Sequence, residues 1–220
     1  MMIQGTCFRL KTVFALMVAS VGLLNSCKED DDAELISRVQ LVNTSEKLGG
    51  LDLYINNSKV TGNALNYAEA SGYLQIKAGS STADIRAGSD VKDGLITTFD
   101  YGKNYTLYVL SSDSTNNIIA TSDYSTVPSS GNSKFRFINL SSSIKAVSVK
   151  LDDSVSIADS LISGNLTDFK VILAGKHNIK FTSKLDSTIT TNTDFTFQDG
   201  KIYSVYFSSI TNGLKFVNHK

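Results

Sequence analysis

The sequence predicts an all-β protein built from two tandem immunoglobulin-like antiparallel β-sandwiches. Three observations support this prediction: an internal repeat, strand-like alternation within each copy, and a composition suited to strands and turns. Serine and threonine contribute 49 of the 220 residues, and there is a single proline. Threonine favours strands, whereas serine, asparagine and glycine favour turns. The 21 basic and 21 acidic side chains cancel, so the chain has no strong positive field to attract a nucleic acid.

The repeat has an almost constant offset. Leu51–Asn57 matches Val147–Asp153 at an offset of 96 residues. Gly102–Tyr105 matches Gly200–Tyr203 at an offset of 98, with Gly, Lys and Tyr identical in both copies. Matches in the same order at one spacing indicate two copies of one structural unit.

The repeat also predicts how the chain is divided. We expect a linker between the two copies at 125–133, because this stretch is rich in Ser and Gly and holds the only proline. The predicted parts are a signal peptide (1–26), a lipidated cysteine with an acidic tether (27–34), module 1 (35–124), the linker (125–133) and module 2 (134–220).

Each module alternates with a period of two residues. Leu51, Leu53 and Ile55 are separated by polar or aromatic residues, which indicates a strand with one buried face. We expect seven strands in module 1, at about 37–43, 50–56, 73–77, 82–87, 95–100, 104–111 and 117–122.

Two acidic or amide pairs follow equivalent strands. Asn56-Asn57 and Asp152-Asp153 are predicted to form tight hairpin turns, because Asn and Asp tolerate positive φ. The aspartate pair also suggests a calcium site. The uncharged pair at the equivalent place favours the turn.

The N-terminus resembles a bacterial lipoprotein signal. Arg9 and Lys11 precede the uncharged run Val13–Leu24, which is too short to cross a bilayer. The run ends in Leu24-Asn25-Ser26-Cys27, which resembles a lipobox. The resemblance implies cleavage after Ser26 and acylation of Cys27, including palmitate on its sulfur.

A charged stretch follows the predicted lipid anchor. It consists of Lys28, Glu29, Asp30, Asp31 and Asp32. One interpretation is a solvated, self-repelling tether. A second, compatible one is a sorting tag, because the stretch resembles those that send lipoproteins to the outer face of the outer membrane. We therefore predict a lipid-anchored protein of the cell outer membrane that faces the exterior.

Four segments together resemble one known family. They are Arg38–Asn43, Leu51–Asn56, Leu74–Gly79 and Gly102–Leu107. In order and spacing they are similar to the bacterial "domain of unknown function 4397". The resemblance implies secreted or surface β-sandwich proteins, often lipoproteins, with tandem modules. It implies no activity and no catalytic residues.

The sequence marks no catalytic residue, metal site or cofactor site. His177 is expected to lie exposed in a turn and His219 in a tail. Cys7 is lost with the signal, so acylation of Cys27 leaves no free thiol. Tyr105, just after Gly102, is predicted to be either a tyrosine corner or a plain core aromatic. We therefore predict a protein that is not an enzyme.

Four tyrosines fall on polar faces or in loops by alternation: Tyr54, Tyr67, Tyr101 and Tyr108. They could face a glycan ligand, or they could pack against the partner module, and packing is the favoured interpretation. The predicted function is a structural, adhesion or interaction module, with the membrane and a glycan or envelope protein as partners. The alternative is a glycan- or nutrient-binding accessory of an outer-membrane uptake system, and a weaker one is a hydrolase.

Overall fold

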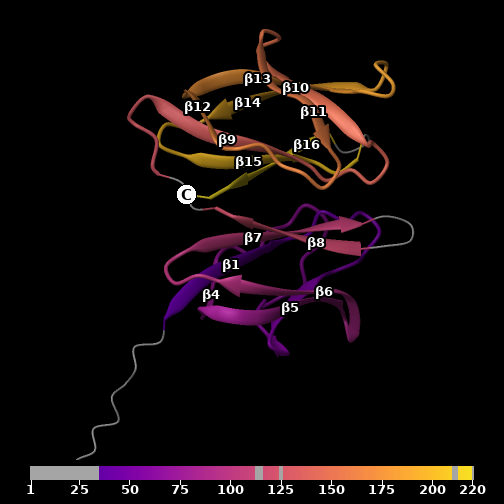
Figure 1. Cartoon of the computed structure of the whole chain (residues 1–220), viewed down its shortest axis with the longest axis vertical. Helices are drawn as coiled ribbons and strands as arrows, with labels where there is room; N and C mark the ends of the chain where they lie inside the picture. The colour runs from indigo at the N-terminus through magenta and orange to yellow at the C-terminus, as the bar shows by residue number, and fades with distance from the viewer. Residues whose placement is uncertain (1–34, 112–115, 124–125, 210–212, 220) are drawn as a thin grey trace, which may run out of the picture. The chain divides into compact units, whose positions relative to one another are not determined.

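The computed structural model describes residues 35–111, 116–123, 126–209 and 213–219. Within them the secondary structure is entirely β (Figure 1). Leu35–Lys220 form one compact unit. The predicted signal peptide, Cys27 and the charged stretch that follows it lie outside the described residues.

Module 1 is a sandwich of two four-stranded sheets, β4-β1-β7-β8 and β3-β2-β5-β6. Its strands are β1 (Ile36–Val42), β2 (Asp52–Ile55), β3 (Ser58–Lys59), β4 (Leu74–Lys77), β5 (Gly79–Ala87), β6 (Asp90–Phe99), β7 (Asn104–Ser111) and β8 (Asn116–Ser122).

Module 2 repeats this plan with the sheets β12-β9-β15-β16 and β11-β10-β13-β14. Its strands are β9 (Asn132–Asn139), β10 (Ala146–Leu151), β11 (Val155–Ile162), β12 (Lys170–Leu173), β13 (Gly175–Ser183), β14 (Thr190–Phe197), β15 (Ile202–Phe207) and β16 (Leu214–Asn218). The prediction of two tandem all-β sandwiches is therefore confirmed.

Two details differ from the predicted strands. The sheets are antiparallel except for β1 with β7 and β9 with β15, which pair in parallel. Among the described residues of module 1 there are eight strands rather than seven, because the short β3 pairs with β2 beyond the turn. In each module the first strand pairs with the seventh, so the beginning and the end of the module lie side by side in one sheet.

Backbone conformation confirms the two predicted turns. Asn56 and Asn57 have φ of 48° and 65°, and Asp152 and Asp153 have 50° and 57°. Consecutive positive φ values are typical of a type I′ turn, whose twist matches that of the strands it joins. The two copies thus use the same turn, and its residue types explain the aspartate pair without a cation.

A buried asparagine holds an equivalent loop in each copy. Asn43 donates from Nδ2 to the carbonyl of Leu65 at 2.8 Å, and Asn139 donates likewise to Leu161 at 3.0 Å. Both side chains are fully buried. A buried amide without partners would cost about 1–3 kcal/mol, so these loops are fixed by the asparagines they enclose.

The predicted tyrosine corner is present in both copies. The Tyr105 hydroxyl accepts a hydrogen bond from the backbone N–H of Asp100 at 3.1 Å, and Tyr203 accepts one from Gln198 at 3.4 Å. Each ring also packs edge-on against a buried phenylalanine, Phe99 or Phe197. The ring therefore serves the core while its hydroxyl holds the preceding turn.

We expect Asn57→Val to be less stable than Asn57→Gly by about 1–2 kcal/mol, because a β-branched side chain resists positive φ. Both variants lose the hydrogen bond from Arg86 to the Asn57 side chain, so their difference isolates the backbone. Urea denaturation measures it. The same pair of changes at the exposed strand residue Ser58 is the control and should not favour glycine. Equal stability of the two Asn57 variants would contradict the turn assignment.

Candidate functional site

A third buried cluster joins the two modules. It contains Val42 and Tyr108 from module 1 and Ile138, Leu140, Tyr206 and Val217 from module 2. The rings of Tyr108 and Tyr206 lie 6.0 Å apart between centroids. Because β7 and β15 are covered on their outer faces as well as their inner ones, consecutive residues are buried at Thr106–Val109 of β7 and along the whole of β15.

Tyr108 therefore cannot face a ligand. Its side chain is fully buried, which makes the prediction of a ligand-facing Tyr108 wrong and bears out packing against the partner module. Burial raises the pKa of Tyr108 to about 12 and also raises the pKa of Tyr206, because a phenolate would lose its hydration.

A buried cation lies beside this cluster. The guanidinium of Arg136, on β9, forms an ion pair with Asp123, which follows β8 in module 1. It also donates to the Ser122 carbonyl and to Thr121 Oγ1, each at 2.8 Å. Its fourth partner, Ser204 Oγ, is in module 2 and accepts from Nε at 2.8 Å. Arg136 thus connects both modules, and its side chain is only 2% exposed.

Asp123 is correspondingly surrounded by donors. Besides Arg136, it accepts hydrogen bonds from the hydroxyls of Thr106 and Tyr73 at 2.5 and 2.9 Å. Its side chain is 1% exposed. Burying a charge is tolerated only when it is paired and hydrogen-bonded, and this pair meets both conditions. Desolvation and Asp123 together raise the pKa of Tyr73.

His219 completes the polar cluster, and the expectation that it lies in a tail missed its burial. It follows β16 directly, and its side chain is 2% exposed. Nε2 lies 2.7 Å from Ser204 Oγ, and Nδ1 lies 2.9 Å from the Tyr73 hydroxyl. Burial lowers the pKa of His219 from 6.5 to about 4, so the ring is neutral at neutral pH.

Ser204, His219 and Asp123 are the three residue types of a hydrolytic Ser-His-Asp triad. Their geometry does not fit one, because Ser204 is fully buried and its oxygen already accepts from Arg136. A nucleophile must reach its substrate. We call the set of Arg136, Asp123, His219, Ser204 and Tyr73 the junction cluster, and its contacts join strands of both modules.

The other predicted tyrosines have three different environments. Tyr54 is half-buried and lies beneath the Arg86 guanidinium, 4.1 Å from ring centroid to Cζ. The Tyr67 hydroxyl lies 2.8 Å from Ser208 Oγ of module 2, so Tyr67 also contacts the partner module. Tyr101 is 66% exposed, and of the four tyrosines it is the one with an open ring.

His177 also differs from its predicted exposed turn. It lies within β13, and its side chain is 16% exposed. Nδ1 is 2.6 Å from Asp152 Oδ2, and Nε2 is 2.9 Å from the Leu173 carbonyl. The backbone N–H of Asn178 and the His177 ring hold the pKa of Asp152 below its usual value. The histidine therefore fixes the β10–β11 turn.

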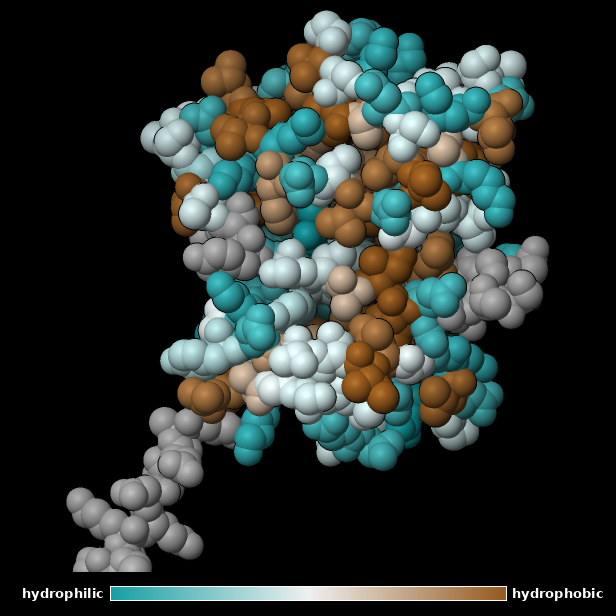
Figure 2. Space-filling view, viewed as in Figure 1, coloured by the Kyte–Doolittle hydropathy of each residue, from teal (hydrophilic) through white to brown (hydrophobic). Residues whose placement is uncertain are grey.

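No group of three or more His, Cys, Asp or Glu suited to a metal occurs in the part of the chain that the structure describes. On the face shown in Figure 2, apolar side chains reach the surface in separate groups between polar ones. The most exposed large apolar residues include Ile96, Leu173 and Leu185, each at least 70% exposed.

We expect Arg136→Met and Asp123→Leu each to lower the free energy of unfolding by about 3–5 kcal/mol, because each leaves one buried charge unpaired. The double variant should lose much less than the sum, since no isolated charge remains. Urea denaturation of the four proteins measures the coupling. Asp90→Ala, at the exposed pair with Lys92, is the control and should change little. Additive losses would contradict a coupled buried pair.

We expect stability to fall between pH 6.5 and 4 more steeply in the wild type than in His219→Gln. The folded pKa lies below the unfolded one, so the unfolded chain binds more protons in this window and stability is lost as pH falls. The difference should reach about 3 kcal/mol at pH 4 and vanish above pH 7. Denaturation curves at a series of pH values measure it, and parallel profiles would contradict the assignment.

Comparisons with known proteins give a family match and two weak structural likenesses. One solved structure is CBMbc, of family CBM26, from Eubacterium rectale Amy13K in complex with maltoheptaose. It is 10% identical and covers 82% of this chain and 96% of its own, with a TM-score of 0.25. Another, from Bacteroides uniformis, is described as a candidate cell adhesion protein. It is 10% identical and covers 86% and 97%, with a TM-score of 0.24.

TM-scores this low carry no argument about what the chain binds. No curated protein sequence matches the chain. The sequence model of one family, described as "Domain of unknown function (DUF4397)", matches residues 37–150. This match spans all of module 1 beyond Ile36, then β9 and β10 of module 2 up to Lys150. Since it covers more than half of the chain, the protein belongs to the DUF4397 family.

Proposed function

We propose that this chain is a non-enzymatic adhesion or interaction module, held on the outer membrane by lipid on Cys27 and facing the exterior. The observation that carries the proposal is the junction cluster. Arg136 and Asp123 are buried against each other from opposite modules, so separating the modules would break this ion pair and expose the apolar side chains packed beside it. Two sandwiches joined this way present one stiff body to a partner.

The chemistry of the described residues supports a binding role over a catalytic one. Ser204, His219 and Asp123 are sealed inside the junction, where their hydrogen bonds are used in joining the modules. His177 is occupied by Asp152 and a backbone carbonyl. The two histidines of the chain thus both serve structure.

The sequence supports attachment to the membrane through Cys27. Eight residues separate Cys27 from Ile36, where β1 begins. Fully extended, such a segment reaches about 30 Å, so the first sandwich would stay close to the membrane surface. Two or three acyl chains on one cysteine give lasting attachment, whereas a single chain gives only marginal binding. None of the described residues forms a helix long and apolar enough to cross a bilayer.

We expect Cys27→Ala to abolish incorporation of labelled palmitate and to move the chain from the membrane to the soluble fraction, because no sulfur remains to carry the lipid. Protease treatment of intact cells should degrade the wild-type chain. Cells that display it should attach to one another or to coated surfaces more than cells producing Cys27→Ala.

Cys7→Ala is the matched control, because it lies in the same leader and should leave labelling, fractionation and attachment unchanged. Palmitate retained on Cys27→Ala would contradict the anchor. Protection of the wild-type chain on intact cells would contradict the exterior location. Equal attachment by both kinds of cell would contradict an adhesive role.

A further inference from the structure

Two lysines face each other across the exposed side of module 2. Lys150 on β10 and Lys180 on β13 are directly paired in the antiparallel register. Like charges placed opposite each other on neighbouring strands destabilise a sheet. The other cross-strand neighbours of this pair are the uncharged Ser156 and Asn192. The fold alone gives no reason for two cations here.

Nearby acidic side chains neutralise the charges of the two lysines only in part. Asp153 lies 3.6 Å from Lys180, a loose pair in which the Lys180 side chain is 42% exposed and the Asp153 side chain 72%. For Lys150, the described residues provide no ion-pair partner. Two lysines and one aspartate leave a net charge of +1 on this part of the sheet.

The same positions in module 1 show a different solution. At an offset of 96 residues, Tyr54 stands in place of Lys150 and Asp84 in place of Lys180. There Asp84 pairs with Arg86 at 2.9 Å, and Asp52 pairs with Lys59 at 2.9 Å. Module 1 neutralises this face by itself, so the uncompensated lysines are not a requirement of the repeat.

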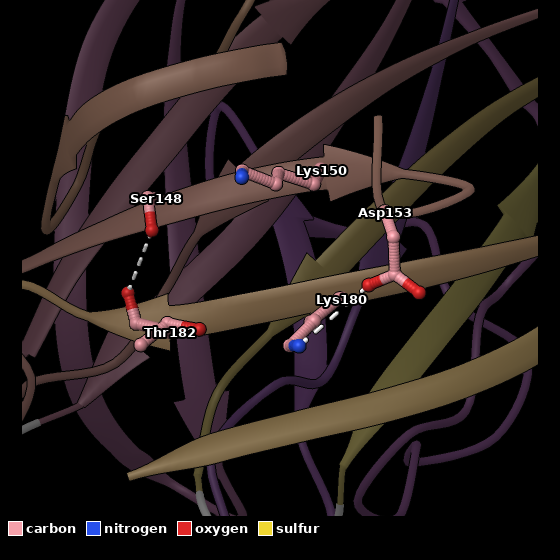
Figure 3. Close-up of a pocket in the computed structure, with 5 residues that line it drawn as sticks. All are labelled: Ser148, Lys150, Asp153, Lys180 and Thr182. Carbon is pink, nitrogen blue, oxygen red and sulfur yellow. Dashed lines mark hydrogen bonds and ion pairs between the residues drawn. The ribbon is translucent and has the colours of Figure 1, made fainter. Parts of the chain in front are cut away.

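The lysines line a shallow concavity of about 360 Å³, which Figure 3 shows across β10 and β13. Its other lining residues are Ser148, Thr182 and Asp153. Ser148 and Thr182 are paired in the register two residues along from the lysines, on the same face of the sheet, and add two hydroxyls. The volume lies at the low end of ligand pockets and suits one sugar unit with its charged group.

We propose that this concavity binds the anionic group of an acidic polysaccharide, a uronate carboxylate or a sulfate ester, with Lys150 and Lys180 as the charge donors. The inference deepens the proposed interaction role and rests on it only for the protein's location. Hydrogen bonds from a lysine ammonium to an oxyanion are stronger than those between neutral groups. The hydroxyl of Ser148 donates to the Thr182 carbonyl, and that of Thr182 bonds Thr190. Each hydroxyl oxygen has a second lone pair that can accept from a ring hydroxyl of the sugar.

The surroundings favour a sugar over a peptide or a lipid. β10 and β13 are both inner strands of their sheet, paired on each side, so an extended peptide finds no free strand edge to join. The lining residues include no large apolar side chain that could enter a bilayer. They also include no aromatic ring, which points to recognition by charge and hydroxyls rather than by stacking of neutral sugars.

The test is binding of the full chain in a neutral detergent to oligogalacturonate, to a sulfated glycan such as chondroitin sulfate, and to neutral dextran, measured by calorimetry. We expect binding to one of the anionic glycans, weakened by added salt, and none to dextran. Lys150→Gln and Lys180→Gln should each weaken binding about tenfold, as expected for loss of one charged hydrogen bond. Which glycan binds distinguishes carboxylate from sulfate.

Lys176→Gln is the matched control. Lys176 lies on β13, like Lys180, but it is paired with Asp194 at 2.7 Å. Its replacement should therefore leave the affinity for the glycan unchanged. Lys150→Glu adds a readout independent of binding. It should abolish glycan binding yet raise the midpoint of thermal unfolding, because it converts a like-charge pair into an opposite-charge pair.

Failure of both anionic glycans to bind would overturn the proposal, as would equal losses in Lys176→Gln. Binding of inorganic sulfate alone would reduce the site to a simple ion site and overturn the sugar assignment. Binding of polyglutamate or of anionic lipid vesicles through the same lysines, in place of glycans, would also overturn it. None of these results depends on where the chain lies in the cell, which the palmitate and protease experiments decide separately.

Discussion

The buried ion pair between Arg136 and Asp123 is the constraint on which the two-module body depends. Each charge alone would be costly in the interior, and together they are acceptable only while both modules stay in contact. Such a pair adds less net stability than its Coulomb attraction suggests, because both ions lose water. Its stronger effect is to select one arrangement of the two modules, since few others would pair both charges and satisfy all their hydrogen-bonding groups.

The junction also retains the symmetry of the repeat. Positions 96 or 98 residues apart occupy corresponding places in it: Gln40 with Arg136, Thr106 with Ser204, Thr121 with His219, and Tyr108 with Tyr206. Gln40 bonds Thr106 in its own module and His219 in the other, and Arg136 bonds Ser204 and Thr121 likewise. Two copies of one surface therefore meet, as in an isologous dimer. The contact is asymmetric because the uncharged Gln40 of module 1 corresponds to the charged Arg136 of module 2.

Local patterns predicted the fold well because they act over a few residues. The turn at Asp152 and Asp153 follows from residue type and from its aligned partner. Packing of the outer tyrosines against the partner module was the favoured interpretation and holds for Tyr67 and Tyr108. The polar groups of the junction were not predicted, because alternation assigns a side chain to the outer face without saying what covers that face. One signal was available: Tyr108 and Tyr206 put large aromatic rings on the outer face of the same strand in both copies. His219 gave no such signal, because Thr121 stands at its aligned position.

The two remaining outer faces are under a different constraint. The surfaces that meet at the junction must match each other, whereas the sheets containing β2 and β10 each face away from that contact. On one of these, Asp84 and Arg86 neutralise each other; on the other, Lys150 and Lys180 do not. Module 2 can tolerate the repulsion between its two lysines, because the junction and the two separate cores supply the stability of the whole chain. The unfavourable lysine pair is therefore where selection for binding, rather than for folding, is best sought.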